Sequence, residues 1–371
     1  MRKDCFNVSE NTKVFVYCPA GIVTGGAELL HQLVDVINRN GGNAFIVYYG
    51  SAPHTVPDDY KKYDVQISDG IVDAAEHIVV IFEGYFKKLF EIRNAQVLLW
   101  WLSVDNYFLC QSSNLVLKDL MGFDFIFGIK TLVKRGVKAL LGKRERCIFS
   151  LKDLSVSPLV RCNAYQSEYA KDFLEKKGFK NVLPLKDFIN SEHCFDESLL
   201  DKKKDIVLYN PKKGMKFTRR LIQSAPDIAW KPIQNMSRSE VVECLRTSKV
   251  YIDLGYHPGK DRLPREAAMN GCCIITGKNS SAGFYGDIPI DEHEFKFSQR
   301  ASDIPKIVSK IKFELENYDT EIMKFRHYRD CIAREKEEFE NQARELLNLT
   351  NMGGVNNFYS VAVFPCMGAA A

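Results

Sequence analysis

The strongest constraint in this sequence is a series of short apolar runs, each separated from the next by a segment with helical spacing. After residues 13–18, for example, residues 27–38 place apolar side chains three and four positions apart. Short apolar runs between helices are typical of parallel sheets covered on both faces. The runs expected to form strands are residues 13–18, 44–49, 77–82, 96–102, 123–127, 159–164, 205–209, 228–233, 249–254 and 272–276.

These runs fall into two successive α/β units. A chain of 371 residues is long enough for two domains of about 100–200 residues each. We expect a first domain over residues 1–187 and a second over 188–330, joined through the polar stretch 186–203. The mostly helical residues that follow predict a C-terminal helix and tail over 331–371, which can cross back to the first domain.

The charge balance and the cysteine pattern exclude several classes of protein. The 51 basic and 47 acidic residues give a net charge of +4, too even for a general nucleic-acid binder. The eleven cysteines lack the spacing of a zinc site, and we interpret them as reduced thiols. No apolar run reaches the roughly 20 residues of a membrane span, and the first residues lack the apolar stretch of a signal peptide. We therefore expect a cytoplasmic protein.

A pair of glycines, Gly25 and Gly26, lies between the first strand and the first helix. Glycines at this point let a ligand approach the backbone, and a helix N-terminus favours anions. The pattern is not the GxGxxG of dinucleotide-binding proteins. Taken alone, the pair is more typical of a tight turn from strand to helix.

Basic residues follow two strands of the second unit. Lys212 and Lys213 follow the strand at 205–209, and Lys260 and Arg262 follow the strand at 249–254. Ligands of open α/β sheets bind beyond the carboxyl ends of strands, where such cations can hold phosphate. The alternative is a pair of solvated basic loops.

Two acidic residues complete the candidate binding groups. Glu266 lies in the first turn of the helix after Arg262 and can accept hydrogen bonds from ribose hydroxyls, or simply favour the helix dipole. Asp105 follows the buried strand at 96–102 with Ser103. Asp105 can bind a sugar hydroxyl or act as a base, or it can cap the next helix.

One segment of the first unit has the pattern of a basic amphipathic helix. Apolar residues occupy one face of residues 129–141, and lysines and arginines lie around the other face and continue to Arg146. Such a helix can rest on an anionic membrane surface or hold an acidic acceptor. The alternative is a core-packed helix with a solvated basic face. The residues are Ile129, Leu132, Val133, Val137, Leu140 and Leu141, with Lys130, Lys134, Arg135, Lys138, Lys143, Arg144 and Arg146.

Taken together, the two units, the Gly-Gly turn and the basic loops resemble GT-B glycosyltransferases of the family 4 and family 1 group, over most of residues 13–340. The most specific segment is RLPREAAMNGCCIIT, residues 262–276, which is similar to the donor-binding segment E-A-x-A-x-G-x-P-V of that group. The resemblance implies two Rossmann-like domains whose parallel sheets face a central cleft. It also implies that Glu266 holds the donor ribose and that Lys212 and Lys213 hold the diphosphate.

The sequence also departs from the family pattern. Family 4 proteins usually carry a second glutamate eight residues before the ribose-binding one, and here that position is Pro258. The contacts to the donor sugar therefore do not carry over, and retention or inversion of the anomeric centre stays open. Asp105 and His257 are the candidates near the reacting sugar, with Asp105 as the base of an inverting reaction or an orienting group of a retaining one.

The resemblance thus predicts a metal-independent glycosyltransferase without a cofactor. Its donor is a nucleotide sugar, bound through Gly25, Gly26, Lys212, Lys213, Lys260, Arg262 and Glu266. Its acceptor is a saccharide or a glycolipid in surface polysaccharide or glycoconjugate biosynthesis, with residues 129–146 at the inner face of a membrane and no nucleic-acid partner. A nucleotide-sugar epimerase or hydrolase, and a non-catalytic sugar-nucleotide-binding subunit, are the alternatives.

Overall fold

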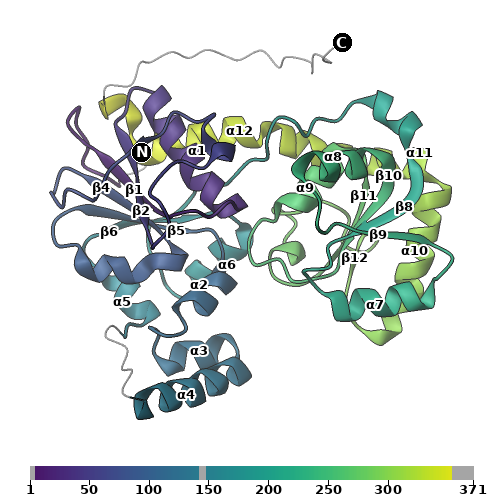
Figure 1. Cartoon of the computed structure of the whole chain (residues 1–371), viewed down its shortest axis with the longest axis horizontal. Coiled ribbons are helices and arrows are strands. Elements are labelled where there is room, and N and C mark those ends of the chain that lie inside the picture. The colour runs from purple at the N-terminus through teal and green to yellow at the C-terminus, as the bar shows by residue number, and fades with distance from the viewer. Residues whose placement is uncertain (1–4, 142–147, 353–371) are drawn as a thin grey trace. The chain divides into compact units, whose positions relative to one another are not determined.

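The computed structural model describes residues 5–141 and 148–352, which form two units (Figure 1). Within these residues, unit 1 contains the chain up to Lys186 together with the residues from Glu338, and unit 2 contains Asp187–Glu337. The long helix α12 (Arg326–Leu347) therefore begins in unit 2 and ends in unit 1.

Unit 1 is built on a seven-stranded parallel sheet with the order β3-β2-β1-β4-β5-β6-β7. Its first six positions follow the order of doubly wound nucleotide-binding sheets. The central strands are buried on both faces, which explains their nearly continuous apolar runs. The strands are β1 (Val14–Pro19), β2 (Ala44–Tyr49), β3 (Gln66–Ile67), β4 (Ile78–Phe82), β5 (Gln96–Trp101), β6 (Val160–Tyr165) and β7 (Val182–Pro184).

Most helices of unit 1 begin at side-chain caps. The hydroxyl of Thr24 accepts the amide hydrogen of Ala27 at the start of α1, and Ser103 does the same for Asn106 in α2. Most of α1 is buried against β1 and β2. The helices are α1 (Gly25–Arg39), α2 (Val104–Gln111), α3 (Leu117–Phe123), α4 (Phe125–Leu140), α5 (Leu151–Val156) and α6 (Glu168–Lys176).

Unit 2 is built on a five-stranded parallel sheet with the order β12-β11-β10-β8-β9. The strands are β8 (Lys204–Tyr209), β9 (Ala229–Pro232), β10 (Ser248–Asp253), β11 (Cys273–Gly277) and β12 (Lys296–Phe297). The helices are α7 (Met215–Ser224), α8 (Arg238–Thr247), α9 (Arg262–Met269), α10 (Ile304–Glu316) and α11 (Tyr318–Glu321), followed by α12. Short 3-10 segments lie at Asp58–Tyr60, Glu83–Glu91, Glu197–Lys202, Ser281–Gly283, Ala301–Asp303, Ile322–Phe325 and Leu349–Met352.

Two local expectations were wrong. Residues 123–127 do not form a strand, because the Asp124 carboxylate accepts the amide hydrogen of Phe127 at 2.7 Å and starts α4 there. The cysteines are not all reduced thiols, because Cys194 is disulfide-bonded. The other cysteines among the described residues are free. No helix within 5–141 and 148–352 is long and apolar enough to cross a membrane.

Candidate functional site

Two loops meet at the carboxyl edge of the unit 2 sheet, where the strand order reverses. Strands β8 and β10 are neighbours, but the chain continues from β8 to one side and from β10 to the other. Ligands of open α/β sheets bind at such a switch point. The loops touch through two glycines: a Cβ on Gly214 would lie 2.9 Å from the Cα of Gly255, and one on Gly255 would lie 2.5 Å from the Cβ of Lys213. Gly214 also has a φ of 62°, which favours glycine.

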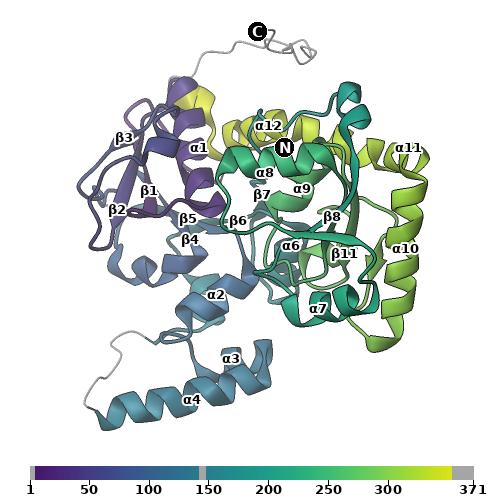
Figure 2. The same ribbon diagram turned by 45° about the vertical axis from the view of Figure 1, so that its right-hand side comes forward.

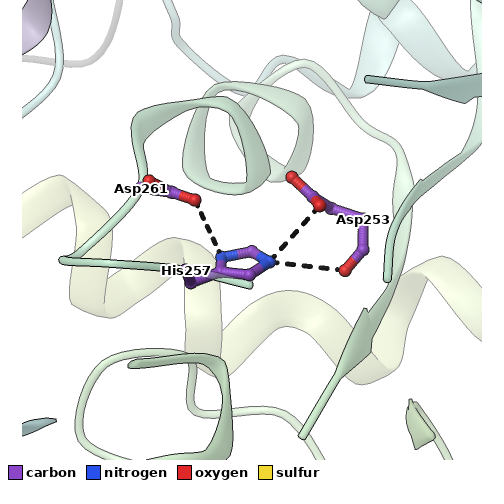
Figure 3. A group of neighbouring side chains, drawn as sticks. All are labelled: Asp253, His257 and Asp261. Carbon is purple, nitrogen blue, oxygen red and sulfur yellow. Dashed lines mark hydrogen bonds and ion pairs between the residues drawn. The ribbon is translucent and has the colours of Figure 1, made fainter. Parts of the chain in front are cut away.

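A cluster of four charged side chains lies where these two loops meet, and Figure 3 shows the three that come from the β10–α9 segment, Asp253, His257 and Asp261. The Lys213 ammonium forms an ion pair with the Asp261 carboxylate. The His257 Nδ1 lies 3.1 Å from a carboxylate oxygen of Asp261, and its Nε2 lies 3.5 Å from Oδ1 and 3.3 Å from the main-chain oxygen of Asp253. The ring of His257 is 0% exposed, so it bridges the end of β10 to the start of α9.

The carboxylates decide the charge of this buried ring. Burial lowers the pKa of His257, but the hydrogen bond and negative charge of Asp253 and the charge of Asp261 outweigh it, so the pKa is raised. Burial likewise raises the pKa of Asp253, but His257 and Lys213 outweigh it and the pKa is lowered. Both ring nitrogens face carboxylates, and a place for His257 near the reacting sugar stays a prediction. His257 therefore ties together the two ends of the β10–α9 loop, whereas the ion pair of Lys213 with Asp261 links that loop to the β8–α7 loop.

The same cluster has the geometry of a metal site. Ligand atoms of Asp253, His257 and Asp261 lie within 4.8 Å of one another. Lys213 already supplies a positive charge at Asp261. A divalent cation would compete with this ammonium and with the protons on His257, because a metal ligand must be deprotonated. A site without a metal therefore stays a prediction.

The cations of the β10–α9 loop form ion pairs with carboxylates of unit 2. Lys260 is 8% exposed, and its ammonium lies 2.7 Å from Glu335. Arg262 is partly exposed, and its Nε lies 3.5 Å from Asp187. Sequence analysis missed Arg265, which is 0% exposed and pairs with both Asp187 and Glu335. Of the four predicted phosphate-binding cations, Lys213, Lys260 and Arg262 are thus each paired with a carboxylate, and Lys260 is the most buried of these three.

Glu266 lies on α9, directly after the buried Arg265. Its side chain is 19% exposed, and one oxygen lies 3.7 Å from His193 Nε2. Burial raises its pKa despite the charges of Arg262, Arg265 and Arg238. His193 was missed by sequence analysis, because an isolated histidine in a polar stretch carries no pattern. On the opposite loop, Lys212 is exposed and Lys213 is 23% exposed.

The predicted residues of unit 1 lie at the carboxyl ends of β1 and β5. Gly25 and Gly26 open α1, where a Cβ on Gly26 would lie 3.7 Å from Leu102. Asp105 is 6% exposed and accepts a hydrogen bond of 2.8 Å from the Tyr169 hydroxyl. Asp105 is not the cap of the helix that follows β5, because Ser103 is.

A further carboxylate in unit 1, Glu83, was missed. It directly follows the buried strand β4 and accepts the amide hydrogen of Leu102 at 3.0 Å. Burial raises the pKa of Glu83 to about 8, against the lowering effect of its backbone hydrogen bonds to Leu102 and Ser103. Glu83 therefore holds the short segment between β5 and α2, the helix that carries Asp105 in its first turn. Glu83 could have been predicted from the sequence, because it follows an apolar run that forms a strand, and Asp105 was identified by the same reasoning.

Comparisons with known proteins give the fold a name. No family model matches the sequence, and no curated protein matches it. Sucrose-phosphate synthase from Thermosynechococcus elongatus superposes with a TM-score of 0.59 at 11% identity, over 93% of this chain and 100% of that one. The chain has a GT-B glycosyltransferase fold.

Two further GT-B structures resemble the chain less closely. WaaG, a glycosyltransferase involved in lipopolysaccharide biosynthesis, gives a TM-score of 0.50 at 11% identity, over 89% of this chain and 98% of that one. The lipopolysaccharide outer core galactosyltransferase WaaB gives 0.50 at 10% identity, over 91% and 99%. Of the predicted site residues, Lys213, Arg262 and Glu266 lie at one edge of the unit 2 sheet. Asp105, Gly25 and Gly26 belong to unit 1.

Proposed function

We propose that this chain is a glycosyltransferase that moves a sugar from a nucleotide-sugar donor to a saccharide or glycolipid acceptor. The observation that carries the proposal is the contact of the β8–α7 and β10–α9 loops at the switch point of a GT-B unit, with Lys213 on one loop and Glu266 following the other. A basic side chain and a carboxylate at such an edge suit a nucleoside diphosphate, whose phosphates and ribose need opposite partners.

Unit 2 would bind the nucleotide part of the donor. No side chain caps the first turn of α7 or of α9, so the backbone amides there favour an anion. The Lys213 ammonium binds the diphosphate, and to do so it either leaves its ion pair with Asp261 or contacts Asp261 and the diphosphate together. Lys212 and Arg262 add positive charge. Glu266 accepts hydrogen bonds from the ribose hydroxyls. Lys260 supports the loop from inside rather than touching the donor.

The chemical step would release a nucleoside diphosphate, whose developing negative charge must be stabilised. Lys213, Arg262 and the two helix N-termini supply that stabilisation in a reaction without metal. Asp105 is the proposed group of unit 1 near the acceptor. It acts as the base if the reaction inverts the anomeric centre, and it orients the donor if the reaction retains it.

The proposed setting is surface polysaccharide or glycoconjugate assembly on the cytoplasmic side of a membrane. The roles of WaaG and WaaB, which both concern lipopolysaccharide, support this setting. The GT-B fold alone does not select it, because one fold hosts many acceptors.

The test is a two-stage assay of the purified chain. A thermal-shift panel of nucleotides and nucleotide sugars identifies the donor, because a ligand of the folded state raises the melting temperature by mass action. Turnover of that donor is then followed with and without saccharide and glycolipid acceptors. We expect glycosylated product only with an acceptor, and we expect EDTA to leave the rate unchanged.

The other outcomes separate the alternatives. Conversion of the donor without acceptor indicates an epimerase or hydrolase. Donor binding without turnover, whichever acceptor is supplied, indicates a non-catalytic binding subunit. Absence of binding by every nucleotide sugar contradicts the proposed function, and loss of turnover in EDTA that added metal restores contradicts the metal-free reaction.

A further inference from the structure

Helix α4 exposes a dense patch of large apolar side chains. Residues 125–141 contain eight of the twenty exposed large apolar side chains among the described residues. Exposed apolar patches of this kind mark sites that contact another surface. We define the α4 apolar face as Phe125, Ile126, Ile129, Leu132, Val133, Val137, Leu140 and Leu141, which are between 41% and 89% exposed.

This face is turned away from the body of unit 1. The buried residues of α4 are Gly128 and Thr131, and a Cβ on Gly128 would lie 3.0 Å from the Cα of Met121 in α3. Arg135, on the same side of the helix, donates to the main-chain oxygens of Ser112 and Leu115. At about 100° per residue, the apolar face lies on the other side. The interpretation of α4 as a core-packed helix is therefore wrong.

The contacts of α4 also leave it apart from the sheet. Figures 1 and 2 show α3 and α4 side by side, away from the other helices of unit 1. The helix pair is joined by the close approach at Gly128 and by the edge-to-face contact of the Phe123 and Phe127 rings, and Phe127 packs against the core of unit 1. Neither Gly128 nor Phe127 belongs to the α4 apolar face. Packing within unit 1 therefore does not account for the apolar residues on the far side of α4.

The charges beside the apolar face identify its partner. Lys130, Lys134 and Lys138 follow one another at four-residue spacing along one flank, with Lys130 and Lys134 exposed. With Arg135, α4 carries four cations and no acidic residue. A helix with an apolar face and a basic flank lies in the interface of an anionic bilayer, because its side chains meet acyl chains and headgroups together. Lys143, Arg144 and Arg146 lie outside the described residues.

We propose that α4 docks unit 1 on an anionic lipid bilayer, with the apolar face at the boundary of the acyl chains and the lysine flank among the headgroups. A second copy of the chain fits less well, because a symmetric contact would bring the lysine flanks of the two copies together. An acidic saccharide leaves the apolar side chains in water. The inference goes beyond sugar transfer and does not depend on it.

The test measures binding of the full chain to lipid vesicles by flotation. Vesicles of phosphatidylcholine are compared with vesicles that also contain phosphatidylglycerol, at low and high salt. We expect binding only with the anionic lipid, and weaker binding at high salt because ions screen the lysine flank. Sugar transfer is not needed for this readout, so failure here and failure of the proposed function are distinguishable.

Two variants with matched controls localise the contact. K130E/K134E removes the flank, and K177E/K180E makes the same charge change at exposed residues elsewhere in unit 1. We expect the first to weaken vesicle binding on the order of 25-fold or more, at about fivefold for each lysine lost. V133S/V137S removes part of the apolar face, and V72S/V156S makes the same change at exposed valines elsewhere in unit 1. We expect several-fold weaker binding for the first pair only.

Three results would overturn the proposal. The first is absence of binding that depends on anionic lipid. The second is equal loss of binding in the α4 variants and their controls. The third is a wild-type dimer that V133S/V137S converts to a monomer while vesicles bind neither protein, which would make the face a contact between copies. Melting temperatures should match the wild type in all four variants, because every substituted side chain is exposed.

Discussion

Arg265 donates from Nη2 to both carboxylate oxygens of Asp187, at 2.8 and 2.9 Å. Its Nη1 donates to Glu335 at 2.7 Å. Asp187 opens unit 2 along the chain and Glu335 lies near its end, so one buried guanidinium ties both ends of the unit to α9. This arrangement holds the helix that carries Glu266.

Removing one carboxylate of this anchor should destabilise unit 2. Asp187→Asn leaves Arg265 buried with half of its counter-charge, at a cost of about 3–5 kcal/mol in the free energy of unfolding. The control is Asp205→Asn, which weakens a pair between Lys249 and an Asp205 side chain that is 70% exposed and should cost less than about 1 kcal/mol. Urea unfolding gives both values, and equal stability of the two variants would refute the role of the anchor.

Donor binding should depend on Lys213 and Glu266. Each side chain is expected to make a charge-assisted hydrogen bond to the donor, so Lys213→Ala and Glu266→Ala should each weaken nucleotide-sugar binding about tenfold or more. Lys204→Ala changes an exposed lysine at the opposite end of β8 and serves as the control. Calorimetry measures the three affinities. Wild-type affinity in both site variants would show that the donor binds elsewhere on the protein.

The buried His257 should make the stability of unit 2 sensitive to pH. Its pKa is raised above the ordinary value of 6.5, so its contribution is complete below that value and is lost as pH rises through the folded-state pKa. His257→Gln should lower the melting temperature most at mildly acidic pH and less in the alkaline range. His293→Gln is the control, because that side chain is 85% exposed. Identical pH profiles of the wild type and His257→Gln would exclude a charged ring.

Glu83 should act on unit 1 with the same sign of pH dependence. Its pKa is raised from 4.5 to about 8, so the folded state holds a proton that the unfolded chain has lost, and stability falls as pH rises between these values. Glu83→Gln keeps the shape without the proton. The free energy of unfolding of Glu83→Gln should therefore rise relative to that of the wild type as pH increases from 4.5 to about 8. The total change in this difference is up to about 5 kcal/mol, at 1.36 kcal/mol per pH unit.

Glu76→Gln, at an exposed position, is the control for Glu83. Denaturant unfolding at several pH values measures both differences. A pH-independent difference between Glu83→Gln and the wild type would mean that Glu83 is ionised in the folded protein.

Most strands were predictable because their evidence is local. The runs at 13–18, 44–49 and 249–254 differ by only one residue or less at each end from β1, β2 and β10. The capping box of Ser237 and Glu240 also depends on near neighbours, because its two residues are three positions apart, and the structure shows both of its hydrogen bonds. The edge strands β3, β7 and β12 are two or three residues long, too short for a repeating pattern.

Residues 123–127 show where local evidence misleads. Phe123, Phe125, Ile126 and Phe127 have the composition of a buried strand. The chain is helical there because Asp124 caps α4, and two of the side chains that suggested burial, Phe125 and Ile126, are 64% exposed. Apolar composition indicates that a residue needs an apolar partner, but not that the partner belongs to the same chain.

By itself, the sequence determined the two parallel α/β units, most of their longer strands and the loops that carry the candidate site residues, since each depends on neighbours along the chain. It could not rank Lys212, Lys213, Lys260 and Arg262, which look alike as loop cations. Only the tertiary structure decided that Lys260 is paired with Glu335 and that Lys213 stands at the contact of two loops. The charge available to a ligand depends on which carboxylates the fold brings alongside, and those come from Asp187, Asp261 and Glu335, mostly far away along the chain.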